Sequence, residues 1–121
     1  MPCTLKKLQQ VIALLASALW TAAAYAAPYP EKPVRMICPF PPGGAADMVS
    51  RLLAEKMTAS LGRQVIIDNR TGAGGNIGVE LAAKAAPDGY TILLASSSNF
   101  SFAPSLGAKL PYDPQRDFSS I

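Results

Sequence analysis

The sequence predicts an α/β fold with a mainly parallel sheet flanked by helices. Short apolar stretches alternate along the chain with longer segments whose apolar residues recur at helical spacing. Two apolar stretches are each followed by a glycine-rich loop and then by a helical pattern, so one strand–loop–helix unit occurs twice. Continuous apolar strands that alternate with helices are typical of parallel sheets covered on both faces, with right-handed crossovers between the strands.

The first 26 residues have the pattern of a cleaved export signal. Lys6 and Lys7 precede an apolar run at residues 11–23, and the small-residue pattern Ala24-Tyr25-Ala26 closes it. The run is shorter than the roughly 20 residues that a membrane-spanning helix needs, so a membrane anchor is the less favoured alternative. We expect cleavage near Ala26 and export to the periplasm, with the folded part at residues 27–121.

Composition argues against several classes of protein. The formal net charge is +3, and because two lysines leave with the signal, the remaining chain is almost neutral and no nucleic-acid partner is expected. The sequence has no histidine, which excludes a Ser-His-Asp or Cys-His arrangement and most zinc sites. We therefore expect no enzyme activity, no metal and no cofactor. Cys38 lies in an apolar stretch and is expected to be a buried hydrophobe.

The first strand–loop–helix unit covers residues 34–62. Residues 34–38 predict a strand, which ends at the proline- and glycine-rich residues that follow. From Ala45 to Leu61 apolar residues recur at helical spacing, and Gly62 suits the position just after a helix. The side chains expected to face the core from this helix are Met48, Val49, Leu52, Leu53, Met57 and Leu61.

The second unit begins with a short strand at residues 65–67. After a loop at residues 69–75, we expect a helix that faces inward with Ile77, Leu81 and Ala85 and runs to the turn at residues 87–89. Residues 91–95 predict a third strand. Beyond Asn99 the periodicity stops, so residues 102–121 are expected to be extended and irregular.

The two glycine-rich loops are the candidate binding elements. In parallel sheets ligands lie outside the carboxyl ends of the strands, so residues 40–44 and 72–76 should converge there with the polar residues 96–99. A helix that begins just after such a loop presents unpaired N–H groups and the positive end of its dipole, which suits a small anion. Asp47 fits two roles: it accepts hydrogen bonds from amides at the helix start, or it holds an ordered water or a ligand ammonium group.

The second loop resembles a dinucleotide-binding fingerprint. It misses the pattern G-x-G-x-x-G because Ile77 stands where the last glycine is needed. Close helix–strand packing and a tight turn, with Asn76 as a helix cap, explain the same glycines. A dinucleotide-binding enzyme fragment and a stand-alone interaction module therefore remain alternative interpretations.

Five motifs in order resemble the Bug family, the extracytoplasmic solute-binding proteins of tripartite tricarboxylate transporters. The motifs cover most of the chain after the signal and lie at residues 29–35, 39–44 with Asp47, 69–78, 87–91, and 110–114 with Asp117 and Phe118. The resemblance implies a two-lobed clamshell of the type II periplasmic-binding-protein kind, monomeric, which captures a small carboxylate and delivers it to membrane subunits of the transporter.

Combining this resemblance with the two loops gives a set of candidate ligand-binding residues. They are Phe40, Pro42, Gly43, Gly44, Ala45, Asp47, Gly74, Gly75, Asn76, Ser96, Ser97 and Asn99. Members of the family are about three times longer, so we expect residues 27–121 to be an incomplete first lobe, with the second lobe absent. The sequence does not tell which carboxylate is bound.

Overall fold

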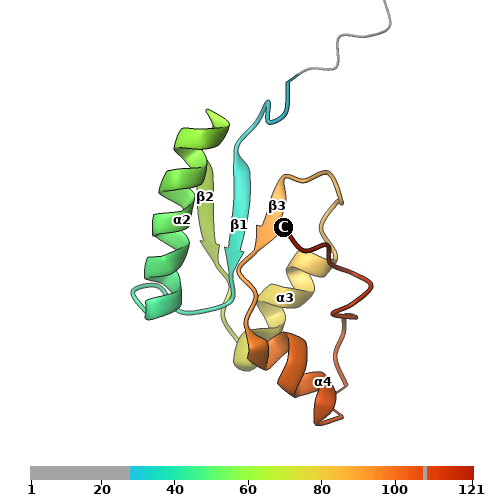
Figure 1. Ribbon diagram of the computed structural model, residues 1–121. Helices are drawn as coiled ribbons and strands as arrows, with labels where there is room; N and C mark the ends of the chain where they lie inside the picture. The colour runs from blue at the N-terminus through green and yellow to red at the C-terminus, as the bar shows by residue number, and fades with distance from the viewer. Residues whose placement is uncertain (1–27, 108) are drawn as a thin grey trace, which may run out of the picture.

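Three parallel strands form one sheet in the computed structural model, which describes residues 28–107 and 109–121. The central strand β1 (Val34–Cys38) pairs with β2 (Val65–Asn69) on one side and with β3 (Thr91–Leu93) on the other (Figure 1). The expected parallel sheet is confirmed. The first strand has the predicted bounds, the second runs two residues further than predicted, and the third ends two residues earlier. The predicted export signal lies outside the described residues.

The helices α2 (Ala45–Leu61) and α3 (Asn76–Ala83) lie on either side of the sheet (Figure 1). Helix α2 packs over β1 and β2, whereas α3 packs against β1 and β3. In the strand order β2-β1-β3, the connection from β1 to β2 runs towards one edge of the sheet and the connection from β2 to β3 runs back towards the other edge. Because both connections are right-handed, their helices lie on opposite faces of the sheet. The core under α2 contains Val34, Met36, Ala54 and Val65, with Met57, Leu61, Ile67, Tyr90 and Ile92 partly buried around it.

Helix α2 has the predicted bounds but not the predicted orientation. Gly62 ends it as expected, and the Gly62 amide donates to the Thr58 carbonyl at 3.0 Å. Of the six apolar side chains expected in the core, only Met57 and Leu61 pack there. The other four are 44 to 62% exposed: Met48, Val49, Leu52 and Leu53.

The face that α2 buries is made of small and polar residues. Asp47, Ser50 and Ala54 are buried, and they share the helical spacing that places them on one side with Met57 and Leu61. Small side chains let the helix lie close to the sheet, and the Ser50 hydroxyl is satisfied within the helix by the Ala46 carbonyl at 2.8 Å. The predicted core-facing side was wrong for residues 48–53, because hydrophobicity alone did not identify the face of the helix in contact with the sheet.

Helix α3 is also rotated relative to the prediction. Ile77 and Leu81 are exposed and Ala85 is half-buried, while Gly78 and Val79 are buried. A Cβ atom at Gly78 would lie 2.6 Å from the Arg70 carbonyl oxygen, so only glycine permits this close approach. The packing interpretation of the second loop is thus confirmed at Gly78. The expectation that Asn76 caps the helix is wrong, because the cap position is Gly75 and no side chain caps it.

The tail is helical at first, contrary to the prediction of an extended segment. A π-helical turn at Ser98–Phe102 leads into the short helix α4 (Ala103–Ser105). Further along, the tail packs against this turn through an aromatic cluster of Phe100, Tyr112 and Phe118, whose ring centroids lie 5.0 to 6.4 Å apart. Contacts between aromatic rings therefore join the π-helical turn to the tail.

Among the described residues, none of the helices has both the length and the apolar character needed to cross a membrane.

The observed orientation of α2 predicts a small effect on stability at one position and a large loss of stability at a neighbouring one. We expect Leu52→Glu, on the exposed face, to change the free energy of unfolding by less than about 0.5 kcal/mol, because leucine and glutamate have similar helix propensities. Ala54→Leu, on the buried face, should destabilise the protein by about 1–3 kcal/mol because the core has no room for the larger side chain. Denaturant unfolding of both variants measures this. A larger loss for Leu52→Glu would contradict the observed orientation.

Candidate functional site

The two glycine loops and residues 96–99 come together at the carboxyl ends of the strands. The Asn69 side chain, at the end of β2, donates to the Phe40 carbonyl in the first loop at 3.0 Å. The Asn99 side chain, after β3, donates to the Gly74 carbonyl in the second loop at 3.0 Å. These two hydrogen bonds confirm the expected convergence of the three segments on one edge of the sheet.

The first loop presents its backbone to solvent at the start of α2. Pro42, Gly43, Gly44 and Ala45 are all exposed. Gly44 is the cap residue, with φ −80° and ψ 171°, and no side chain caps the helix there. The amides of the first helical turn have no partner within the helix, so the N–H groups that begin at Ala45 are available to an acceptor in front of the loop.

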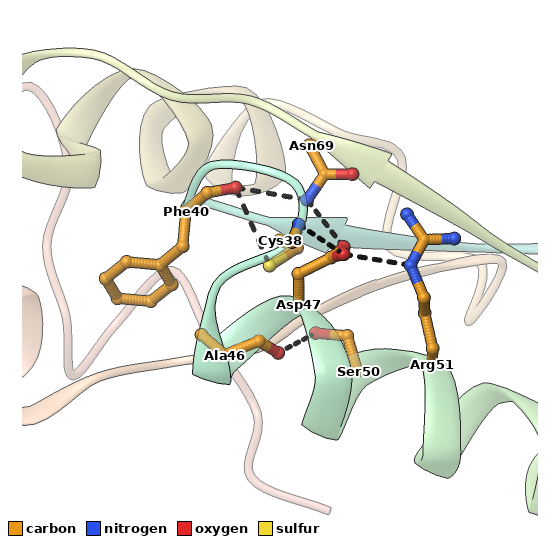
Figure 2. Close-up of polar contacts among 8 residues, drawn as sticks. Cys38, Phe40, Ala46, Asp47, Ser50, Arg51 and Asn69 are labelled. Atoms are coloured by element: carbon orange, nitrogen blue, oxygen red, sulfur yellow. Dashed lines mark hydrogen bonds and ion pairs between the residues drawn. The ribbon is translucent and has the colours of Figure 1, made fainter.

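Asp47 holds the first loop in place through three hydrogen bonds (Figure 2). Its Oδ2 accepts from the Gly43 amide and from Arg51 Nε, both at 2.9 Å. Its Oδ1 accepts from Asn69 Nδ2 at 2.9 Å. The side chain is almost completely buried, so it joins the loop, the helix and β2 from inside.

These donors also stabilise the charge on Asp47. Hydrogen bonds from Arg51, the Gly43 amide and Asn69 lower the pKa of Asp47 from 3.8 to about 2, so the group is ionised at neutral pH. The ion pair with Arg51 offsets this negative charge. The structural interpretation of Asp47 is therefore supported, although the amide that it accepts from belongs to the loop and not to the helix start.

The second loop packs against Asn99 and Pro39. Gly75 has φ 93°, and a Cβ atom there would lie 3.3 Å from Asn99 Oδ1 and from Pro39. Glycine is needed at this position both for its positive φ and for the close approach. Asn76 is the first residue of α3, and its Oδ1 accepts a hydrogen bond from Asn99 Nδ2 at 2.7 Å. Gly74 and Asn76 are thus hydrogen-bonded to Asn99, and Gly75 packs against it.

The serines after β3 differ in their contacts, because Ser96 and Ser98 are hydrogen-bonded to each other and Ser97 is exposed. Ser96 donates to Asn99 Oδ1 at 2.8 Å and its Oγ lies 2.7 Å from Ser98 Oγ. Ser97 is exposed, and its hydroxyl caps no helix. The structure therefore leaves Ser97 at the surface beside a buried Asn99, which is only 2% exposed.

Three residues of this site were missed by the sequence reasoning. Asn69 and Arg51 hold Asp47, and Tyr112 donates from the tail to the second loop, with its hydroxyl 3.0 Å from Asn76 Oδ1. The spacing of Asp47 and Arg51, four residues apart on a helix, is a recognised signal for an ion pair. Asn69 and Tyr112 lie within two of the family motifs, but the sequence did not show their roles, because their partners Asp47 and Asn76 lie far away in the sequence.

The site is an open surface in the described part of the chain. Two shallow hollows, of about 550 and 440 Å³, are lined by residues 28–31 with 61–63 and by residues 33–35 with 66–68 and 70, respectively. Neither includes a predicted site residue. The described residues contain no group of three His, Cys, Asp or Glu side chains that could hold a metal ion.

The hydrogen bonds of Asp47 predict a pH-dependent stability. Because its pKa in the folded protein, about 2, lies below the ordinary value of 3.8, the ionised group stabilises the fold above about pH 4, and this contribution is lost as the pH falls towards 2. We expect Asp47→Asn to lower the melting temperature at pH 7 by several degrees, and the difference from the wild type to shrink towards pH 2. Glu55→Gln, which removes an exposed carboxylate from the same helix, is the control. A constant difference across this pH range would contradict the prediction.

Comparison with known proteins gives consistent results. Protein BugT of Bordetella pertussis is 44% identical over 108 residues, which is 88% of this chain and 33% of the relative. MatC from Rhodopseudomonas palustris, solved with bound malate, superposes with a TM-score of 0.73 at 36% identity over 77% of this chain and 32% of that one. The periplasmic binding protein BugD is 53% identical, with a TM-score of 0.61 over 64% of this chain and 25% of that chain.

These likenesses confirm the expected periplasmic-binding-protein fold class. The chain spans about a third of the length of the curated relatives it matches. The sequence pattern of the family described as tripartite tricarboxylate transporter family receptor matches residues 49–121, which is more than half of the chain. The chain therefore belongs to this receptor family, the family of the Bug proteins.

Proposed function

We propose that this protein captures a small carboxylated metabolite outside the cytoplasm and delivers it to the membrane subunits of a tripartite tricarboxylate-type transporter. The observation that carries the proposal is the open start of α2, where an exposed glycine loop is followed by uncapped backbone amides. The family membership and the malate bound by the related MatC support a carboxylate as the ligand.

The charge distribution at this helix start favours an anion. The N–H groups from Ala45 onwards and the positive end of the helix dipole attract negative charge. Asp47 would oppose this if its carboxylate were free, but Arg51 and the other two donors engage it. The remaining contacts of the ligand would come from the backbone of Phe40 and Gly44 and from the hydroxyl of Ser97, with Pro42 and Gly43 shaping the loop, because proline has no N–H group and the Gly43 amide donates to Asp47.

The alternative of a dinucleotide-binding enzyme fits the second loop poorly. A pyrophosphate needs free backbone amides in that loop, whereas here Gly75 packs against Asn99 and Pro39 and its amide donates to the Gly72 carbonyl at 2.9 Å. The matching family is described as a receptor family and BugD as a periplasmic binding protein, which agrees with a binding function.

The domain organisation follows from the same proposal. Residues 27–121 would form the N-terminal part of the first lobe of a monomeric two-lobed binding protein, after removal of a signal near Ala26. Periplasmic location agrees with the description of BugD as a periplasmic binding protein. A ligand enclosed between two lobes would have more of its surface shielded from solvent than a ligand held on the open loop alone. Enclosure of this kind favours a higher affinity.

Replacement of Ala45 by proline tests the proposed anion site. Ala45 is the first residue of α2, where proline is well tolerated, and the extended conformation of Gly44 suits a following proline. Ala45→Pro removes one N–H donor. We expect it to weaken binding of malate or citrate by about 10- to 100-fold, the value of one hydrogen bond to a charged group. Calorimetric titration of the whole protein measures this.

Ala45→Gly keeps the N–H group and serves as the matched control. Equal affinities for the proline and glycine variants would show that this amide does not hold the ligand. Absence of binding by the wild type to mono-, di- and tricarboxylates would contradict the proposed function itself. Retention of NAD by the purified protein would favour the enzyme alternative, and capture of a protein without any small ligand would favour an interaction module.

A further inference from the structure

A cluster of three polar side chains, two of them buried and one half-buried, joins the second glycine loop, the segment after β3 and the tail. Asn76 begins α3, Asn99 lies in the π-helical turn and Tyr112 lies in the returning tail. Their atoms lie within hydrogen-bond distance of one another: Asn99 Nδ2 is 2.7 Å and the Tyr112 hydroxyl 3.0 Å from Asn76 Oδ1. We call Asn76, Asn99 and Tyr112 the polar clasp.

Every hydrogen-bonding group of the Asn99 amide has a partner inside the protein. Its Nδ2 donates to the Gly74 carbonyl and to Asn76 Oδ1, and its Oδ1 accepts from Ser96 Oγ. Asn99 is only 2% exposed, so a ligand has little access to it. The predicted ligand-binding residue Asn99 is therefore better suited to holding the surrounding loops than to binding.

Asn76 has one hydrogen-bonding group left for a ligand. Its Oδ1 accepts from both Asn99 Nδ2 and the Tyr112 hydroxyl, so both lone pairs of this oxygen are in use. The remaining polar group of the side chain is Nδ2, which can only donate. A donor is what a carboxylate requires, and Asn76 is half-buried at the same edge of the sheet as the first loop.

Tyr112 is firmly held where its hydroxyl can impose this orientation. The side chain is 7% exposed and packs against Phe100 and Phe118. Burial raises the pKa of the Tyr112 phenol, so it remains a protonated donor at neutral pH. Besides Asn76 Oδ1, the carbonyl of Asn99 lies 3.2 Å from this hydroxyl. Tyr112 thus contacts both asparagines of the clasp.

We propose that Tyr112 is a positioning residue of the candidate binding site: its hydroxyl fixes the Asn76 amide with the donor free and holds the 96–99 turn against the second loop. The inference rests on the proposed function for its ligand, but the positioning itself is a property of the free protein. Tyr112 raises the affinity for a carboxylate without touching it.

Tyr112→Phe removes the hydroxyl and keeps the aromatic ring. Phe118→Leu is the matched control, because it weakens the same aromatic cluster and leaves each hydrogen bond of the clasp in place. Amide hydrogen exchange of the free whole protein is measured by NMR at Gly75, Asn99 and Phe100, whose amides donate to Gly72 and Ser96 carbonyls. We expect Tyr112→Phe to speed exchange at these amides by roughly 3- to 10-fold relative to the control.

Binding of malate and citrate to the same variants provides the second measurement. We expect Tyr112→Phe to weaken it by roughly 3- to 10-fold, the effect of one lost hydrogen bond, and Phe118→Leu to leave it nearly unchanged. Asn76→Asp keeps an acceptor for Asn99 and Tyr112 but replaces the donor by a negative charge. It should therefore abolish binding with little change in amide exchange.

The outcomes separate this inference from the proposed function. Equal exchange rates in Tyr112→Phe and Phe118→Leu would overturn the positioning role, as would unchanged affinity in a variant whose exchange is faster. If the wild type binds neither malate nor citrate, the proposed ligand class fails. The exchange measurement then still decides whether Tyr112 holds the loops.

Discussion

The buried carboxylate of Asp47 is the interaction on which the rest of this structure depends. It connects the first loop through the Gly43 amide, the helix through Arg51 and the second strand through Asn69. Because Asp47 lies on the side of α2 that meets the sheet, these hydrogen bonds also determine which face of the helix is buried. The exposure of Met48 and Leu52 follows from that rotation. One polar side chain therefore accounts for both the shape of the loop and the packing of the helix behind it.

Sequence reasoning predicted the features that depend on local pattern and topology. The bounds of the first strand and of α2 were correct because proline, glycine and the αL residue Gly62 end these elements through their own backbone preferences. The convergence of the loops was also correct, because parallel strands place their carboxyl ends at one edge. Both predictions required only knowledge of neighbours in the sequence or of strand direction.

The features that sequence reasoning missed depend on contacts between distant residues. The buried side of α2 uses serine, alanine and an ionised, ion-paired aspartate, and a search for large hydrophobic residues at helical spacing does not identify these as core residues. The orientation of α3 depends on the close approach of Gly78 to Arg70 and Pro39. Tyr112 reaches Asn76 across 36 residues of sequence. In each case a specific steric or hydrogen-bonding fit outweighs the average preference of the residue type for the interior or the surface.

The division of roles within the site follows from these contacts. Asp47 and Asn99, the buried polar residues that the sequence nominated as ligand-binding, direct their polar groups into the protein. What is left exposed is the backbone at Gly44 and Ala45 and, after β3, the residue Ser97. Backbone amides recognise the charge and geometry of a carboxylate but not the rest of the molecule that carries it. Under the proposed function, selectivity between carboxylates would therefore come from side chains elsewhere in the protein. The buried polar residues then have a different part in the proposed site, which is to hold the exposed backbone in place, and the hydrogen bond from Tyr112 to Asn76 extends this support to the tail.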